Sequence, residues 1–487
     1  MNLFKSISSN DVTHFIAGEE TRFSGENQSD NISPIDGSVT NKLLCGDTKA
    51  VQSAVDSAKH ALSASDWMHR PVADRAKVVR RLAELIHENK EDLAQLETLD
   101  TGKPISETLT GDIPRAAQNF SFFADLAERE SKEVFTGPGD SQHVTSREAV
   151  GIVGLITPWN LPLYLESWKV APALVCGNAV ILKPAELTPM TALALGHLAL
   201  KAGLPPGLLN IVQGLGPNAA GEKLVAHPDV SAISFTGETT TGQAIAAVAS
   251  PMLKKLSFEL GGKGASVVFA DAQLDLAAKT VVRAAFRNQG QICLAGSRLL
   301  VHSQIKDEFI KRVLAHIKEI RLGDPREKST TMGTLVSHSH RDRVAGFVER
   351  SVESGAQILA GGRKPSSAGA FYEPTLVDKV QQGSEMIQSE VFGPVLTVQT
   401  FEDQKEALSM ANDTCYGLST SVWTQDQQTM ESMCDGLRTG LVWQNSWFLR
   451  NLNSAFGGMK KSGVGREGGR YSLDFFSELK TVSKPKL

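Results

Sequence analysis

From residue 150 onward the sequence alternates short β-branched runs with segments of helical periodicity. VGIVGLITP, NAVILKP, LLNIVQG, SAISFTG and GASVVFA alternate with stretches such as TPMTALALGHLALKAG and GQAIAAVASPMLKKL. Strands that alternate with helices pair in parallel, because each helix returns the chain to the same edge of the sheet. Both faces of such a sheet become covered by helices. The alternation therefore predicts an α/β fold.

The alternation occurs in two blocks. After residue 296 it starts again with RLLVH and IKDEFIKRVLAHIKEI, and it continues with VLTVQTF, STSVWT and TGLVWQN. A chain of 487 residues is also too long for one ordinary hydrophobic core. We therefore expect two α/β domains, with a boundary near residue 260, just after ELGG.

The remaining segments are helical at the beginning and extended in two places. KAVQSAVDSAKHALS and DRAKVVRRLAELIHENKEDLAQL have helical periodicity, and Gly102 and Pro104 are expected to stop the second helix. SQHVTSREAV and the C-terminal KTVSKPKL read as isolated strands without a local partner. An edge strand invites pairing with another chain, so we expect a homo-oligomer.

Composition and charge exclude several classes of protein. The formal net charge of −4 offers no electrostatic footprint for nucleic acid or for an anionic membrane. No apolar run reaches the ~18 residues of a membrane span, and the N-terminus lacks the apolar core of a secretory signal. The five cysteines form no CxxC or Cys/His cluster, which supports neither a disulfide framework nor a zinc site. We expect a metal-free cytoplasmic enzyme.

One cysteine stands apart from the other four. Cys293 lies among glycines, small residues and amides in FRNQGQICLAGSR, and Glu259 precedes a pair of glycines in FELGGKG. A thiol in such a segment can be exposed and activated, and a carboxylate at a domain junction can face a cleft and manage protons. The pair suggests covalent catalysis on a carbonyl compound. Taken alone, such a cysteine is more often a packed core thiol than a nucleophile.

Two segments have features of a nucleotide site. In SAISFTGETTTG, Gly237 and Gly242 bracket the expected start of a helix, where a phosphate can approach backbone N–H groups. In ILKPAE, Lys183 and Glu186 follow a buried strand and can reach a ribose. A carboxylate there would repel a 2′-phosphate, which favours NAD over NADP. Alone, the first motif equally suits a tight turn and the second a solvated surface pair.

The motifs TPWNLPL, ILKPAE, FTGETTTG, FELGGK, NQGQICLAGSR, EVFGPV and FGGMKKSGVGREGG occur in this order along the chain. The ordered set resembles the aldehyde dehydrogenase superfamily. The resemblance implies a Rossmann-like NAD-binding domain (1–126 and 149–259), an α/β catalytic domain (260–466) and a small β bridging element (127–148 and 467–487). The bridging element would build homodimers or homotetramers.

The resemblance also implies roles for single residues. Cys293, as thiolate, would attack the aldehyde, and the side chain of Asn160 with the backbone N–H of Cys293 would stabilise the thiohemiacetal oxyanion. Loss of hydride to the nicotinamide would leave a thioester, and Glu259 would activate the water that hydrolyses it. The cofactor would be contacted by Trp159, by Glu390 at the nicotinamide ribose, and by Phe392 against the ring.

The sequence departs from the superfamily in two places. Glu238 follows FTG where many relatives carry a serine that touches the pyrophosphate, and its carboxylate is expected to turn away from the phosphates. Gly264 and Ala265 replace the Asn-Pro that commonly follows ELGGK, which is expected to loosen the turn behind Glu259.

Within the superfamily, NLPLYLESWK, DIPRAAQNF and WFLRNLNSAFGG are most similar to the 2-aminomuconic and 2-hydroxymuconic semialdehyde dehydrogenases. Those substrates carry a carboxylate remote from the aldehyde, and arginine binds carboxylates with paired hydrogen bonds. We therefore assign Arg115 and Arg450 to the substrate carboxylate. Some of these relatives have a further arginine where Asn453 stands.

Other substrates and classes stay open. Tyr164, Trp168 and Trp447 could form an aromatic wall for a quaternary ammonium such as betaine aldehyde, or simply pack in the core. A general aliphatic aldehyde is a further alternative. Glu259 argues against a CoA-acylating enzyme, since a water-activating base would waste the thioester. A non-catalytic binding or structural descendant is expected to have lost Cys293, Glu259 or Asn160.

Overall fold

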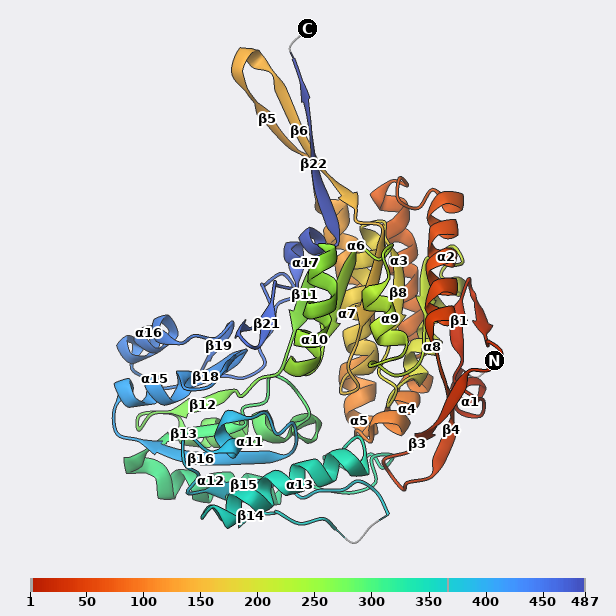
Figure 1. Ribbon diagram of the computed structural model, residues 1–487. Helices are drawn as coiled ribbons and strands as arrows, with labels where there is room; N and C mark the ends of the chain where they lie inside the picture. Colours follow the sequence, from red (N-terminus) through yellow and green to blue (C-terminus); the bar gives the residue numbers. More distant parts are fainter. Residues whose placement is uncertain (1–2, 366–367, 486–487) are drawn as a thin grey trace.

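A computed structural model describes residues 3–365 and 368–485. It places two sheets with their covering helices side by side, and a narrow β arm projects from them (Figure 1). Residues 1–2 and 486–487, at the ends of two predicted domain ranges, lie outside the described part.

The first sheet has eight strands, of which the five central ones are parallel. In spatial order they are β2 (Glu19–Thr21), β1 (His14–Ile16), β9 (Leu209–Ile211), β8 (Ala179–Lys183), β7 (Ile152–Ile156), β10 (Ala232–Thr236), β11 (Lys255–Glu259) and β21 (Gly463–Val464). Every residue of β7, β8 and β10 is buried, because helices cover both faces. The helices are α2 (Thr48–Ser65), α9 (Ala220–Ala226) and α10 (Thr239–Ala249), and on the opposite side α7 (Pro162–Val175), α8 (Met190–Lys201), α3 (Val72–Glu88) and α6 (Ile113–Arg129).

The second sheet has seven strands, parallel except at β14. Their order is β14 (Gln357–Ala360), β15 (Thr375–Asp378), β16 (Val395–Phe401), β13 (Arg298–His302), β12 (Ala265–Val268), β18 (Ser419–Trp423) and β19 (Leu441–Gln444). Leu299 and Val301 of β13 face a core shared with α11 (Leu274–Phe286) and α12 (Lys306–Lys318), whereas Leu300 faces α15 (Gln404–Asn412) and α16 (Gln427–Gly436). Side chains of a strand alternate between its faces, so the sheet is covered twice. The predicted α/β fold is confirmed.

The arm corrects one expectation. β6 (Gln142–Ala149) and β22 (Ser477–Lys484) were expected to be isolated strands, but they pair with each other along their whole length, and β5 (Glu133–Thr136) pairs with the other edge of β6. The pairing was missed because the two segments lie more than 300 residues apart in sequence. The open edges are β5 and β22, with Phe135 and Leu479 exposed. The homo-oligomer stays a prediction.

The N-terminal helices correct a second expectation. The single helix expected before DTGKP is broken into α3 and α4 (Lys90–Thr101) at Asn89, whose side chain donates to the carbonyl of Leu85. The predicted stop is confirmed, since Gly102 adopts a left-handed φ of 72° that favours glycine. The other elements are α1 (Leu3–Ser8), β3 (Asn27–Ile32), β4 (Val39–Cys45), α5 (Ile105–Glu107), a π-helical turn η1 (Thr108–Asp112), α13 (His338–Glu353), α14 (Glu385–Gln388), β17 (Tyr416–Gly417), β20 (Met459–Lys460), α17 (Gly469–Phe475), and the 3-10 turns η2 (Pro138–Asp140), η3 (Ser250–Met252), η4 (Arg287–Gly290) and η5 (Ser303–Ile305).

The two sheets meet near residue 260. Glu259 ends β11 of the first sheet, and Ala265 begins β12 of the second. β21 lies within the predicted catalytic range 260–466 but pairs with β11 of the first sheet. The division into three units stays a prediction. Among the described residues, no helix is long and apolar enough to cross a membrane.

Candidate active site

The carboxyl edge of the first sheet gathers most of the predicted residues. Asn160 follows β7, Lys183 ends β8, Gly237 follows β10 and Glu259 ends β11. Carboxyl ends of parallel strands meet at one edge, and ligands of open α/β sheets bind in the crevice outside it. The local alternation of strand and helix is thus what brings these distant segments together.

Cys293 follows α11, which covers the second sheet, and reaches the same edge through a loop with positive φ values. After α11 the chain passes through Asn288, Gln289 and Gly290, which have φ values of 52°, 54° and 69°. The left-handed backbone conformation costs a non-glycine residue about 1 kcal/mol or more, so contacts with neighbouring groups must stabilise it. Asn288 Nδ2 does so by donating to the carbonyl oxygens of Asn160 at 3.0 Å and Gln291 at 2.7 Å.

These segments enclose a cavity of about 390 Å³. Seven of the predicted residues line it: Cys293, Glu259, Asn160, Trp159, Gly237, Glu390 and Phe392. Glycines let its walls approach closely. A Cβ on Gly262 would lie 2.4 Å from the carbonyl oxygen of Cys293, and one on Gly457 would lie 2.7 Å from Glu259 Oε1. The ELGG and FGG motifs therefore carry glycine because no side chain fits there.

The thiol of Cys293 is held in its neutral form. Burial raises its pKa to about 12, and the carboxyl groups of Glu390 and Glu259 act in the same direction. The guanidinium of Arg450 lowers it only in part. A neutral thiol is a poor nucleophile, so the resting cavity is not yet activated.

Glu259 is also held as an acid. Burial raises its pKa well above the ordinary value, and the nearby Glu467 raises it further. Neither carboxyl oxygen of Glu259 has a hydrogen-bond partner within the described chain. Glu467 itself accepts from Lys169 Nζ at 2.5 Å, and Lys169 also donates to Ser234 Oγ at 2.8 Å. Sequence reasoning missed Lys169 and Glu467.

Asn160 is positioned by one of its two amide hydrogens. Its Nδ2 donates to the carbonyl oxygen of Gln291 at 2.9 Å. A side-chain amide has two N–H donors, so the second can serve a ligand in the cavity.

An aromatic and acidic wall faces these groups. Glu390 Oε1 accepts from the N–H of Gly262 at 2.8 Å, and burial raises the pKa of Glu390 to about 7. The rings of Trp159 and Phe392 meet edge to face at 5.2 Å. His340, which the sequence analysis missed, meets the ring of Trp159 edge to face at 5.1 Å and hydrogen-bonds to the carbonyl of Phe392 at 2.7 Å.

Three predicted cofactor residues are placed differently from the seven above. Lys183 is buried beside the sheet edge, where its Nζ donates to the carbonyl of Pro184 at 2.9 Å and to Glu186 Oε2 at 3.4 Å. Gly242 lies inside α10, and a Cβ there would be 2.7 Å from Leu260 Cδ2, so its glycine serves helix packing.

The two departures from the superfamily can now be placed. Glu238 is exposed and lines the cavity, and its charge raises the pKa of Glu390. That its carboxylate turns away from the cofactor phosphates stays a prediction. Gly264 is closely packed, with 2.6 Å from its Cβ position to the carbonyl oxygen of Ala295. No side chain fits at this position, and the expected loosening of the turn stays a prediction.

Two of the predicted substrate residues, Arg115 and Tyr164, line a cavity of about 200 Å³ together with Arg287 and Phe448. We call this cavity, with the adjoining Arg450, the vestibule; Trp168 and Trp447 do not line it. Arg450 donates to Tyr164 Oη at 3.3 Å, and its guanidinium lies 4.0 Å from the ring of Phe456 and 5.3 Å from that of Trp168.

The other aromatic rings also face arginines. The guanidinium of Arg115 lies 5.7 Å from the ring of Tyr164, and that of Arg283 lies 5.9 Å from the ring of Trp447. Tyr164 and Trp447 belong to the apolar cluster against which Cys293 packs. The vestibule therefore borders the thiol, and the residues predicted for two rival substrates are in contact with each other.

A cavity that holds one thiol, three carboxyl groups and one amide donor, at the carboxyl edge of a doubly wound sheet, fits the class of oxidoreductases that use a cysteine. Residues 22–482 match the aldehyde dehydrogenase family. The chain is 40% identical to 2-hydroxymuconic semialdehyde dehydrogenase of Pseudomonas sp. (strain CF600), covering 97% of this chain and 99% of that protein. It is 41% identical to 2-aminomuconic semialdehyde dehydrogenase of Homo sapiens, covering 93% and 94%.

A solved structure gives the same assignment. Indole-3-acetaldehyde dehydrogenase in complex with NAD+ is 38% identical and superposes with a TM-score of 0.95, covering 97% of this chain and 96% of that one. The chain belongs to the aldehyde dehydrogenase family. The enzyme class and the nicotinamide cofactor predicted from the sequence are confirmed at this level.

Proposed function

We propose that the enzyme oxidises an aldehyde that carries a remote carboxylate, such as 2-hydroxymuconic or 2-aminomuconic 6-semialdehyde, to the dicarboxylate with NAD. One observation carries the choice of substrate. The three rings of the predicted aromatic wall, Tyr164, Trp168 and Trp447, each face a guanidinium of the protein itself. Of the two acids that line the vestibule, Asp112 is paired with Lys103, and burial raises the pKa of Glu107. A trimethylammonium group would meet the like charge of the guanidinium groups on the aromatic faces it prefers, whereas a carboxylate would be attracted to them.

Arg450 is the better placed of the two predicted anchors. Its guanidinium is held by Tyr164 Oη, and its charge is felt at Cys293, whose pKa it lowers. A carboxylate bound to Arg450 would therefore lie on the path to the thiol. Arg115 supports it from the other side of Tyr164.

The chemistry assigned to the cavity begins at Cys293. The thiol must lose its proton, since the thiolate is the species that attacks the aldehyde carbon. The second amide hydrogen of Asn160 and the backbone N–H of Cys293 are the donors for the resulting oxyanion. Donors fixed in a dry cavity stabilise developing charge without reorganising, and one such donor contributes about 3 kcal/mol in other acyl-transfer enzymes.

The cavity and sheet edge suit NAD. Its adenosine ribose would be held by Lys183 and Glu186, its phosphates near Gly237 at the start of α10, and its nicotinamide half by Trp159, Glu390 and Phe392. Glu390 has one oxygen bonded to Gly262 and the other turned to the cavity wall at Gly261, as a ribose acceptor requires. When bound, NAD supplies the oxidant that accepts hydride from the aldehyde carbon.

Glu259 acts after oxidation, as the base for water that hydrolyses the thioester. Its raised pKa keeps it a strong base once deprotonated, and the absence of hydrogen-bond partners among the described residues leaves both oxygens open to water. This assignment disfavours CoA as the acceptor. The presence of Cys293, Glu259 and Asn160 in one cavity disfavours a non-catalytic descendant.

A substrate panel tests the proposal. NADH formation is measured without CoA, using 2-hydroxymuconic semialdehyde, betaine aldehyde and a simple aliphatic aldehyde. We expect kcat/KM for the carboxylated substrate to exceed the others by at least about tenfold, the scale of one charged hydrogen bond. A preference for betaine aldehyde or the aliphatic aldehyde would contradict the proposed substrate, and NADH formation only with CoA would contradict hydrolysis. The cytoplasmic location and the dimer or tetramer stay predictions.

A further inference from the structure

Beside the vestibule lies a second basic region that the proposed reaction does not use. Lys279, Arg283 and Arg287 are spaced four residues apart along α11 and its C-terminal turn, and they line a groove of about 520 Å³. The opposite walls come from α12 and from the segment that includes Glu107 and Gly111. We call this region the α11 groove.

The cations of the α11 groove have no acidic partner. Within the described residues, neither Lys279, Arg283 nor Arg287 has a carboxylate oxygen within 4.0 Å, and the two arginines instead stack on Trp447 and Phe448. Burial lowers the pKa of Arg283, and the charge of Arg287 lowers it further. Like charges held side by side without a counter-ion favour an anionic ligand.

The acidic groups that face the groove offset this charge only in part. Glu319 is exposed and contacts His316, at 3.3 Å between Oε2 and Nδ1. Burial raises the pKa of Glu107, which weakens it as a resident counter-ion, although both arginines act in the opposite direction. Three cations therefore line the groove with two carboxyl groups, and none of the three forms an ion pair with them within the described residues.

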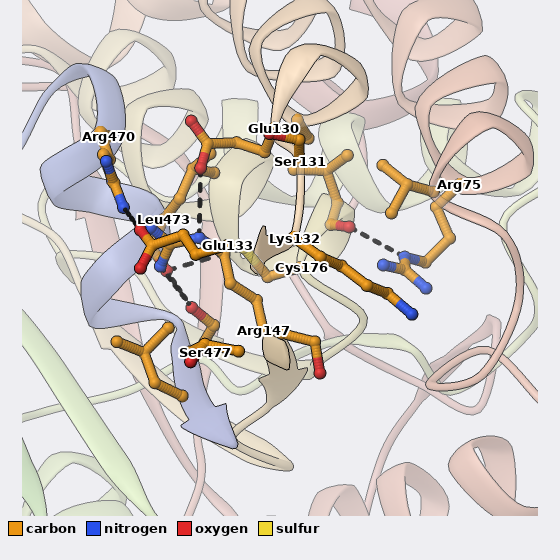
Figure 2. A pocket seen from close by; sticks show the side chains of 16 residues that line it. Arg75, Glu130, Ser131, Lys132, Glu133, Arg147, Cys176, Arg470, Leu473 and Ser477 are labelled. Atoms are coloured by element: carbon orange, nitrogen blue, oxygen red, sulfur yellow. Dashed lines mark hydrogen bonds and ion pairs between the residues drawn. The ribbon is translucent and has the colours of Figure 1, made fainter. Parts of the chain in front are cut away.

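A third basic cavity shows how this chain treats arginines that serve structure. At the foot of the arm, Arg147 and Arg470 line a cavity of about 190 Å³ (Figure 2). Arg147 pairs with Glu130 at 3.3 Å and with Asp474 at 2.5 Å, and Arg470 pairs with Glu133 at 2.6 Å. Both of these arginines are paired with carboxylates, whereas, in the described part of the chain, Lys279, Arg283 and Arg287 of the α11 groove are not.

The groove also continues into the vestibule. Glu107, Gly111 and Arg287 line both cavities, so the two adjoin at Arg287. Residues four apart on a helix are separated by roughly 6 Å along its axis, which is close to the span between the two carboxyl groups of an extended six-carbon diacid. The volume lies within the usual range for a small-molecule site.

We propose that the α11 groove is a second binding site for a six-carbon dicarboxylate, where the product waits on its way out. The identity of the ligand rests on the proposed function, because oxidation of a semialdehyde that already carries a carboxylate yields a dianion. Lys279 and Arg283 hold its two ends, and Arg287 links the groove to the vestibule.

Calorimetric titration of the full-length protein with hexa-2,4-dienedioate at fixed ionic strength tests this. We expect two sites per subunit in the wild type, and one site in Lys279→Glu, with affinity for the lost site reduced at least about tenfold. Arg450→Ala should lose the vestibule site and keep the groove site. Lys279 is exposed and forms no hydrogen bond or ion pair within the described chain, so its substitution does not threaten folding. Arg283→Gln is the second variant.

Lys311→Glu is the matched control, since it makes the same charge change on an exposed residue of the neighbouring α12 that does not line the groove. One site per subunit in the wild type, or two unchanged sites in Lys279→Glu, would overturn the proposal. Equal displacement of hexa-2,4-dienedioate by sulfate would overturn its dicarboxylate specificity. The substrate panel is independent of this titration, so failure of the proposed function and failure of the groove can be told apart.

Discussion

The catalytic cavity and the vestibule are neighbours with opposite electrostatics. In the cavity, burial raises the pKa values of Cys293, Glu259 and Glu390, so three potential anions are held toward their neutral forms. In the vestibule, Arg115 and Arg450 have no acidic partner among the described residues, and their guanidinium groups lie against aromatic rings instead. Reaction chemistry is thus separated from substrate recognition, and each can be broken without the other.

The largest effect is expected from removing the thiol. Cys293→Ser should lower kcat by more than about 10³-fold, because a hydroxyl in the same buried place is far harder to ionise. Steady-state NADH formation measures it. NAD affinity, followed by quenching of protein fluorescence, should stay unchanged as the control. Activity above one tenth of the wild type would refute Cys293 as nucleophile.

The second largest effect is expected from removing Asn160, the proposed donor to the oxyanion. Asn160→Ala should lower kcat by about 10²–10³-fold, since one donor to the oxyanion is lost. KM for the aldehyde should move little, because the amide acts on charge that exists only after attack. A variant that raises KM and keeps kcat would show that Asn160 binds substrate rather than the oxyanion.

Substitutions in the vestibule should change KM rather than kcat. Arg450→Ala should raise KM for the carboxylated semialdehyde and lower kcat/KM by about 10–100-fold, the loss of a charge-assisted hydrogen bond. With an uncharged aliphatic aldehyde the change should stay below about threefold. Arg438→Ala, on an exposed arginine without an ion pair in the described chain, is the control. A similar loss with both aldehydes would show that Arg450 supports the fold of the vestibule instead.

Within the cavity, the charge of Glu467 should shift the pH profile. Glu467→Gln removes a neighbour that raises the pKa of Glu259, and it leaves Lys169 to lower that pKa further. Because the deprotonated carboxylate is the base, the rise of kcat with pH should then begin at a lower pH. On the acidic side of the profile, kcat divided by the high-pH plateau of the same protein should be about two- to fivefold larger in the variant than in the wild type. Glu478→Gln, at an exposed surface pair with Lys255, should leave the profile in place. An unchanged or alkaline-shifted midpoint would contradict the coupling.

Sequence alone located the centre of the site but not what surrounds it. Cys293, Glu259 and Asn160 were found because each lies in a short motif, and the motifs keep their order. The ion pair of Lys169 with Glu467 joins residues 298 apart in sequence. Each lies in a segment that the resemblance uses, NLPLYLESWK and FGGMKKSGVGREGG, but nothing in either segment indicates that the two side chains meet. The break at Asn89 was missed for a related reason: helical periodicity continues across it, and only the side-chain bond to Leu85 marks the end.

The substrate residues show the same limit more sharply. Sequence reasoning treated Arg450 and the ring of Trp168 as evidence for rival substrates, because each suits a ligand of opposite charge. Folding places them 5.3 Å apart, so the ring serves the arginine. A pattern in one segment cannot report which groups from another segment have already occupied its faces.

The smallest effect is expected where an arginine is already paired. Arg470→Gln removes the ion pair with Glu133 at the foot of the arm, where both side chains are about half exposed. Exposed ion pairs contribute little, since water screens the charges and holding two long side chains costs entropy. We expect kcat/KM to change by less than about twofold and the salt dependence of KM to stay that of the wild type. A loss as large as that of Arg450→Ala would mean that an ion pair does not distinguish structural arginines from substrate-binding arginines in this chain. Only the contact with aromatic rings would then set the arginines of the vestibule apart.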